Sequence, residues 1–175
     1  MSATYYVAGL LFGDVRSKVL LIRKSHPDWM KGKLNGVGGH IETDKDERPL
    51  QAMRREFTEE TGLNIGAEDW HKFAVLVGDE ETSDPWWIHW YTASIHHTRH
   101  FNPQAPFENC VVPPQLDEPV NWYEVEALTR GLHSHMMPNL LWLIYMAKAR
   151  LEGAERALGF HITEKYEGRN DYSTE

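Results

Sequence analysis

Three glutamates stand close together on one predicted helix, and their spacing suits the binding of a metal ion. Glu56, Glu59 and Glu60 occupy positions i, i+3 and i+4 in the run from Arg55 to Leu63. Because an α-helix turns about 100° per residue, the three side chains share an arc of about 100° and face one volume. Crowded carboxylates repel each other unless a cation lies among them, and oxygen ligands suit Mg²⁺ or Mn²⁺. The spacing therefore predicts a divalent-metal site.

A solvated acidic face is the alternative interpretation, since most glutamate runs are of that kind. The opposite face of the same helix carries Leu50, Met53 and Phe57 at apolar spacing. We therefore expect the helix to rest on a core and to present its acids away from it. The spacing alone leaves both interpretations open.

The longer stretch from Gly38 to Leu63 resembles the Nudix box, a glycine-rich turn followed by a helix with fixed acid positions. The matching residues are Glu47, Arg55, Glu56, Phe57, Glu59, Glu60, Gly62 and Leu63. The chain departs from the family pattern in one place, because seven residues separate Gly39 from Glu47 where the pattern has five. Lengthening a surface loop by two residues costs little, so we expect a longer segment at Thr43–Asp46 and an unchanged helix.

The resemblance implies a hydrolase that uses water and Mg²⁺, or Mn²⁺ in its place, to cleave nucleoside diphosphates linked to another group. It implies that the three helix glutamates hold the metal, with the backbone carbonyl of Gly38 as a further ligand. Arg55 would lie behind the site and orient a carboxylate, and Glu47 would orient the arginine. We assign catalytic roles to Glu59, Arg55 and Glu118. The physical need is to neutralise phosphate charge while water attacks phosphorus.

Two further candidates lie outside the box. Glu118 precedes a predicted strand, and the resemblance to MutT-type members implies that such an acid joins the metal or activates water. Asp117 is the second candidate for this role, and a solvated turn acid is the alternative. Arg23 ends a predicted strand and matches an arginine that contacts phosphate in similar enzymes. An ordinary surface charge is the alternative for Arg23.

Two asparagines are candidates for recognition of the substrate's base. Asn35 precedes the glycine turn, where 8-oxo-dGTP hydrolases place an asparagine that hydrogen-bonds the purine, and an amide both donates and accepts. Asn139 precedes a predicted helix, where MutT-type enzymes place a second base-reading side chain. An N-cap of that helix is the alternative for Asn139. Trp29, Trp86 and Trp87 are candidates for stacking on a base or for core packing.

Composition favours a compact enzyme. The chain has 175 residues, 41% of them hydrophobic, and we expect one domain over residues 1–162 and a polar tail at 163–175. A net charge of −8 argues against nucleic acid as a partner and leaves a free nucleotide, whose charge the metal offsets. The single cysteine, Cys110, fits a reducing compartment, and the opening segment lacks the features of a signal peptide or membrane span. We expect a cytoplasmic monomer or homodimer with no membrane partner.

Periodicity predicts a mixture of strands and helices. We expect strands at 5–12, 18–23, 37–42, 72–77, 86–95 and 121–125, a loop at 98–116, and helices over the box and at 140–158. The resemblance implies that these elements form an α/β (α+β) fold, a Nudix-type α/β/α sandwich with a mixed β-sheet between helices.

Three functions remain open at this point. The first is a MutT-type pyrophosphohydrolase that cleaves nucleoside triphosphates, including oxidised purine forms, to monophosphate and pyrophosphate. The second is a hydrolase of ADP-ribose or of another nucleoside-diphosphate-linked substrate. The stretch after Gly62 lacks the proline that ADP-ribose enzymes often carry about sixteen residues on, which weighs mildly against it. The third is a non-catalytic nucleotide-binding module, against which the three intact box glutamates argue.

Overall fold

The computed structural model describes residues 3–13, 16–45, 47–78, 85–95, 117–131, 135–153 and 160–164, the last of these as backbone. Within this part of the chain, seven strands form one sheet in the order β3-β2-β1-β5-β4-β7, with β6 also paired to β2. The strands are β1 (Thr4–Phe12), β2 (Lys18–Arg23), β3 (Leu34–Asn35), β4 (His71–Gly78), β5 (Trp86–Ser94), β6 (Val120–Glu124) and β7 (Phe160–Glu164). The α-helices are α1 (Pro49–Thr61), α2 (Val125–Gly131) and α3 (Leu140–Leu151), and three 3₁₀ turns lie at Asp28–Met30, Thr43–Lys45 and Ala67–Asp69.

The sheet is mixed. Strands β1 and β5 run parallel along their whole length, from the pair Thr4 and Trp86 to the pair Phe12 and Ser94. Strands β4 and β7 are also parallel, while β2 pairs antiparallel with β1, β3 and β6. Because β2 and β6 run antiparallel with Ile22 opposite Val120, the segment that follows β2 lies next to the segment that precedes β6.

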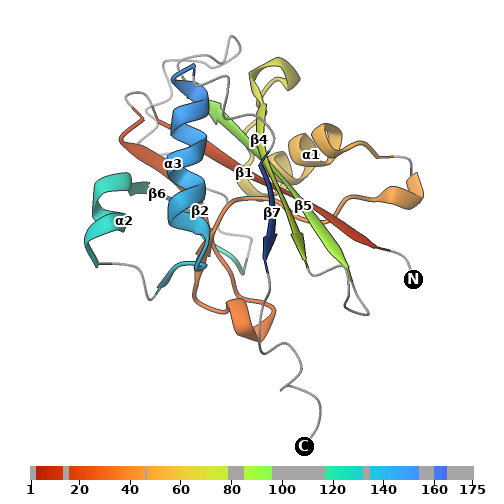
Figure 1. Cartoon of the computed structure of the whole chain (residues 1–175), viewed down its shortest axis with the longest axis horizontal. Coiled ribbons are helices and arrows are strands. Elements are labelled where there is room, and N and C mark those ends of the chain that lie inside the picture. The colour runs from red at the N-terminus through yellow and green to blue at the C-terminus, as the bar shows by residue number, and fades with distance from the viewer. Residues whose placement is uncertain are drawn as a thin grey trace, which may run out of the picture.

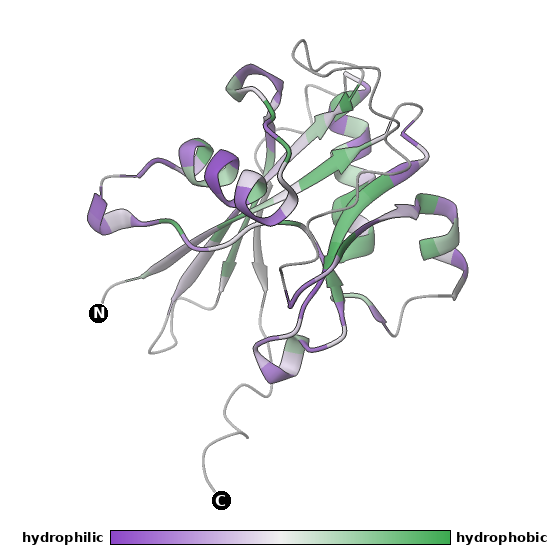
Figure 2. Ribbon diagram, turned by 180° about the vertical axis from the view of Figure 1, so that it is seen from behind, coloured by the Kyte–Doolittle hydropathy of each residue, from purple (hydrophilic) through white to green (hydrophobic). Residues whose placement is uncertain are grey.

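Helices cover both faces of this sheet. Helix α3 lies in front of the sheet in Figure 1, and α1 lies in front of it in the reverse view of Figure 2. One core cluster joins α2 and α3 to the sheet, and a second joins α1 to the opposite face. The expected α/β/α sandwich with a mixed sheet is therefore confirmed.

Local sequence explains the bounds of α1. Pro49 stands at the first helical position, and the side chain of Gln51 accepts a hydrogen bond from Arg48 N at 2.9 Å. Gly62 ends the helix in the left-handed conformation at φ 70°, which glycine adopts without strain. Met53 and Phe57 are buried against β1 and its neighbours, as predicted. The acids do not all point away from the core, because Glu60 stands about 20° from Met53 around the helix and is itself partly buried.

The predicted strand at residues 37–42 is not formed as a strand. This segment makes only single bridges to β1, Val37 with Gly9 and His40 with Tyr6, because Gly38 adopts φ 152° and interrupts the ladder. The regular pairing lies earlier, in β3, where Asn35 is opposite Ile22 of β2.

Three other elements differ from expectation. Helix α3 ends at Leu151 rather than at residue 158, since Gly153 at φ 87° leaves the helical conformation. Helix α2 and strand β7 were not predicted from periodicity, because both are short. Strand β7 extends to Glu164 and so includes the first two residues of the predicted polar tail. The predicted loop at 98–116 lies outside the described residues.

Candidate active site

Glu56 and Glu60 of α1 lie on the side of the helix that faces the glycine turn at Gly38 and Gly39. Arg55 lies among the acids of this helix and donates from Nη1 to Glu56 at 2.8 Å and to Glu59 at 3.3 Å. The Glu56 side chain is 16% exposed, whereas that of Glu59 is 60% exposed. Glu56 is therefore largely shielded from solvent, whereas Glu59 is accessible to it.

Arg55 is held from behind by Glu47, as the resemblance implied. Its Nε and Nη2 atoms donate to the two carboxylate oxygens of Glu47, both at 2.9 Å, and Nη2 also donates to the carbonyl of His40 at 2.9 Å. These bonds lower the pKa of Glu47 and raise that of Arg55. The two extra residues are accommodated by the 3₁₀ turn at Thr43–Lys45, and Glu47 accepts a further bond from Glu42 N at 2.9 Å. The insertion therefore leaves the pairing of Glu47 with the arginine intact.

The glycine turn is packed directly against these acids. Gly38 N donates to Glu60 Oε2 at 2.9 Å, which ties the turn to the end of α1. A Cβ atom on Gly38 would lie 2.3 Å from the carbonyl oxygen of Val7, and φ at this residue is 152°, so only glycine fits. A Cβ on Gly39 would lie 2.5 Å from Glu56 Oε2. Backbone and carboxylates thus approach each other with no room for a side chain.

Glu60 is the acid of α1 whose pKa is raised by its surroundings. Burial raises its pKa to about 7, and the negative charges of Glu56 and Glu118 act in the same direction. The positive charge of Lys24 and the hydrogen bond from Gly38 N act against this rise. Burial is therefore the main cause of the raised pKa of Glu60, and the two groups that favour its charged form do not offset it.

The donor set fits a hard divalent cation. Among the described residues, no three Asp, Glu, His or Cys side chains are already gathered closely enough to hold a metal ion. Arg55 bonds to two of the acids, and the raised pKa of Glu60 lets it keep a proton below about pH 7, so both arrangements offset negative charge that a cation would otherwise neutralise. The oxygen donors of Glu56, Glu59 and Glu60 are of the type that Mg²⁺ and Mn²⁺ prefer.

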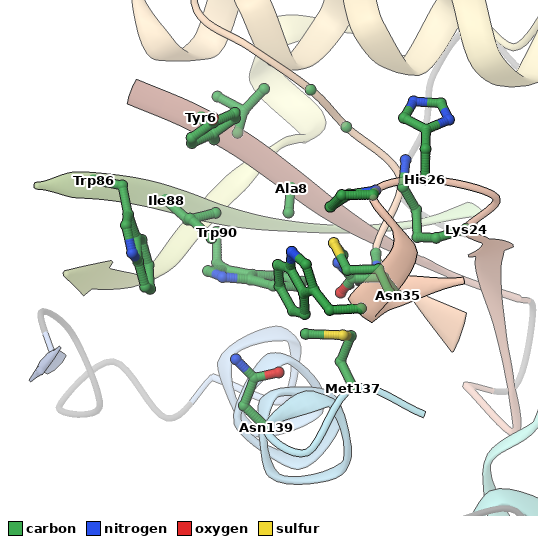
Figure 3. A pocket seen from close by; sticks show the side chains of 17 residues that line it. Tyr6, Ala8, Lys24, His26, Asn35, Trp86, Ile88, Trp90, Met137 and Asn139 are labelled. Carbon is green, nitrogen blue, oxygen red and sulfur yellow. Dashed lines mark hydrogen bonds between the residues drawn. The ribbon is translucent and has the colours of Figure 1, made fainter. Parts of the chain in front are cut away.

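A cavity of about 310 Å³ adjoins the glycine turn. Its walls come from β1, β5, the segment after β2 and the start of α3, and Figure 3 shows the side chains that line it. Most of these side chains are apolar or aromatic, including Trp29, Met30, Trp86, Ile88, Trp90 and Met137. Gly38 and Gly39 belong both to this lining and to the turn beside the acids, so the cavity opens next to the candidate metal site.

Both predicted base-reading asparagines line this cavity. Figure 3 shows Asn35 and Asn139 on two sides of the space near Trp90. Asn35 Oδ1 accepts a hydrogen bond from Gly36 N at 2.9 Å, so its amide nitrogen is the group left for a ligand. Asn139 occupies the N-cap position of α3, yet its side chain makes no capping hydrogen bond, and it is only 7% exposed.

Two of the remaining candidates lie elsewhere. Arg23 donates from Nη1 to the carbonyl of Gly32 at 2.7 Å and is not among the residues that line the cavity. Its neighbour Lys24 does line the cavity, although no motif singled it out. Trp87 is also absent from the lining, and its ring packs 6.3 Å from that of Tyr5.

Glu118 is buried, at 7% exposure, and lies close enough to Glu60 to raise its pKa. Its carboxylate accepts hydrogen bonds from the segment of residues 24–26, and Lys24 is one of the donors. Burial alone would raise the pKa of Glu118, but the bonds from Lys24 and from the amides of Ser25 and His26 outweigh it and lower that pKa. Asp117, the second candidate, is exposed.

The sequence model of the NUDIX domain matches residues 4–142, which is most of the chain. The protein therefore belongs to the Nudix family. With the helix glutamates intact and in register, it is a hydrolase that acts on phosphoric anhydride bonds. No curated protein matches the sequence closely.

Solved structures share the fold at low sequence identity. The mutator MutT protein from Bacillus halodurans superposes with a TM-score of 0.62 at 17% identity, covering 94% of this chain and 91% of that one. A NUDIX hydrolase from Nitrosomonas europaea gives 0.58 at 20% identity, covering 85% and 90%. The NUDIX domain of Shewanella oneidensis NrtR, complexed with ADP ribose, gives 0.60 at 22% identity, covering 86% and 90%. This chain spans 64% of a longer NrtR chain, and 62% of one complexed with a 27mer DNA.

These likenesses establish the fold and leave the substrate open, since MutT and an ADP-ribose complex both occur among them. In the part of the chain that the structure describes, no helix is long and apolar enough to span a membrane.

Proposed function

We propose that this protein is a Mg²⁺-dependent pyrophosphohydrolase of the MutT type, which cleaves nucleoside triphosphates to nucleoside monophosphate and pyrophosphate. The observation that carries the proposal is the junction of two features at one glycine turn. The helix acids lie on one side of Gly38 and Gly39, and an aromatic cavity with two asparagines lies on the other. A nucleotide whose base occupies the cavity would bring its phosphates toward the acids.

The metal would be held by Glu56, Glu59 and Glu60, with the carbonyl of Gly38 as a further ligand. When bound, Mg²⁺, or Mn²⁺ in its place, supplies the positive charge that phosphoryl transfer requires. Arg55 keeps Glu56 and Glu59 oriented, because its guanidinium is itself fixed by two bonds to Glu47. Glu59 is the most accessible of the three acids and is our candidate for accepting a proton from the attacking water.

The cavity supports a base rather than a sugar as the enclosed group. Its mostly apolar, aromatic walls favour a flat ring, which stacks on Trp side chains without needing many polar partners. Asn35 and Asn139 supply amide groups that can read the edge of a purine, including an oxidised one. The net charge of −8 favours a free nucleotide over nucleic acid as the partner, in a cytoplasmic setting.

A product assay over a nucleotide panel tests this proposal. The panel contains nucleoside triphosphates with normal and oxidised bases, ADP-ribose and dinucleotides, each with Mg²⁺, with Mn²⁺ and with chelator. We expect metal-dependent release of monophosphate and pyrophosphate from triphosphates. Preferential cleavage of ADP-ribose would instead favour the second hypothesis, for which the NrtR complex is the specific precedent in this fold. Tight binding without turnover of any compound would indicate a non-catalytic module.

A further inference from the structure

Glu118 is bonded on both carboxylate oxygens to three consecutive residues that lie more than ninety positions earlier in the chain. Oε2 accepts from Lys24 Nζ, while Oε1 accepts from Ser25 N at 2.7 Å and from His26 N at 3.3 Å. The hydroxyl of Ser25 and the ring of His26 each also approach Oε1, at 3.3 Å. A carboxylate so surrounded by donors would have to give up several bonds to become a metal ligand.

These bonds place Lys24 between the aromatic cavity and the acids of α1. The Lys24 side chain is 14% exposed, lines the cavity together with Gly38, and lies near enough to Glu60 to lower its pKa. An ammonium group has three donors, so the bond to Glu118 leaves two for a ligand. Figure 3 shows Lys24 and His26 on the same side of the cavity as Asn35.

The backbone near Lys24 does not depend on Glu118. Gly32 N donates to the carbonyl of Lys24 at 2.8 Å, and Lys24 N donates to the carbonyl of Lys33 at 2.9 Å. The ladder between β2 and β6 continues to a bond from Arg23 N to Pro119 O at 2.9 Å. What Glu118 adds is therefore the direction of the Lys24 side chain and the placement of the two residues after it.

We propose that Glu118 is a positioning residue of the substrate site, which fixes Lys24 where its ammonium contacts a phosphate of the bound nucleotide. Glu118 then acts through Lys24, and the metal is held without it. The inference rests on the proposed function for the identity of the ligand. It replaces Arg23 with Lys24 as the phosphate-binding cation and gives Glu118 a role different from that expected by resemblance.

The test compares Glu118→Ala and Glu118→Gln with Glu124→Ala as a matched control. Glu124 also lies on the β6 side of the β2–β6 pair and bridges Lys18 at 3.6 Å, but this ion pair is exposed and lies outside the cavity lining. Two affinities are measured for each variant. One is for Mn²⁺ alone, and the other is for a non-hydrolysable α,β-methylene nucleoside triphosphate at saturating Mg²⁺.

We expect Glu118→Ala to weaken analogue binding about tenfold or more while Mn²⁺ affinity stays within about threefold. Glu118→Gln keeps an acceptor for the backbone amides and should show a smaller loss, which provides a folded variant if the alanine change prevents folding. Lys24→Met should reproduce the loss, and the double variant Lys24→Met with Glu118→Ala should be no weaker than Lys24→Met alone. Glu124→Ala should bind both ligands as the wild type does.

A tenfold loss of Mn²⁺ affinity in Glu118→Ala, with analogue binding unchanged at saturating metal, would make Glu118 a metal ligand and overturn the inference. Additive losses in the double variant would also overturn it, because Glu118 would then act independently of Lys24. Wild-type protein that binds the analogue but turns over no nucleotide would remove the proposed function and leave this inference standing. Wild-type protein that does not bind the analogue would refute both.

Discussion

Replacing Glu60 by glutamine should stabilise the metal-free protein at neutral pH. The pKa of Glu60 is about 7 in the folded protein against an ordinary value of 4.5, so the folded state holds a proton that the unfolded chain has lost in this window. Stability therefore falls as pH rises from about 4.5 to about 7. At about 1.36 kcal/mol per pH unit, this difference amounts to about 3 kcal/mol above pH 7. A glutamine avoids the cost and still offers an oxygen to Gly38 N.

Urea unfolding in the presence of chelator, at pH values on both sides of this window, measures the effect. The difference in free energy of unfolding between Glu60→Gln and wild type should be near zero at the acidic end and grow toward 3 kcal/mol above pH 7. Glu59→Gln removes the same charge from a side chain that is 60% exposed and should show little of this. Mg²⁺ should stabilise the wild type and have far less effect on Glu60→Gln. A Glu60→Gln protein no more stable than wild type above pH 7 would refute the reasoning.

Three further predictions concern the turn, the arginine and the cavity. Gly38→Ala should destabilise the protein by at least about 2 kcal/mol in thermal or urea unfolding, because the new methyl would lie 2.3 Å from a backbone oxygen of β1. Gly32→Ala, also at positive φ but with nothing within 4 Å, is the control and should cost less. Arg55→Lys should lower kcat about 10- to 100-fold with the fold retained by circular dichroism, since an ammonium cannot bond both oxygens of Glu47 in the same fork. Asn35→Ala should change the ranking of bases in the nucleotide panel more than the dependence on Mg²⁺, and an unaltered ranking would remove Asn35 from base recognition.

The features that could be predicted from the sequence depend on the spacing of residues within a single helix or strand. The positions of Glu56, Glu59 and Glu60 on one face follow from helix geometry alone, and the apolar spacing of Met53 and Phe57 indicated that they are buried. The β-rich runs that form β1, β2 and β5 could also be recognised in the sequence, and the bounds of β2 at Lys18–Arg23 match the prediction at both ends. The periodic pattern weakens in short elements, which is why α2 and β7 were missed.

Contacts between distant segments were decided only by the tertiary structure. Lys24 and Glu118 stand 94 residues apart and meet because β6 pairs with β2, a pairing that no local pattern specifies. Lys24 lines the cavity and Arg23 does not, since adjacent residues of an extended chain point to opposite sides. The sequence by itself determined the family, the reaction class and the acids of α1, because these depend on residues within a few helical turns. Which cation faces the substrate, and which acid holds it there, depends on how the sheet brings remote segments together.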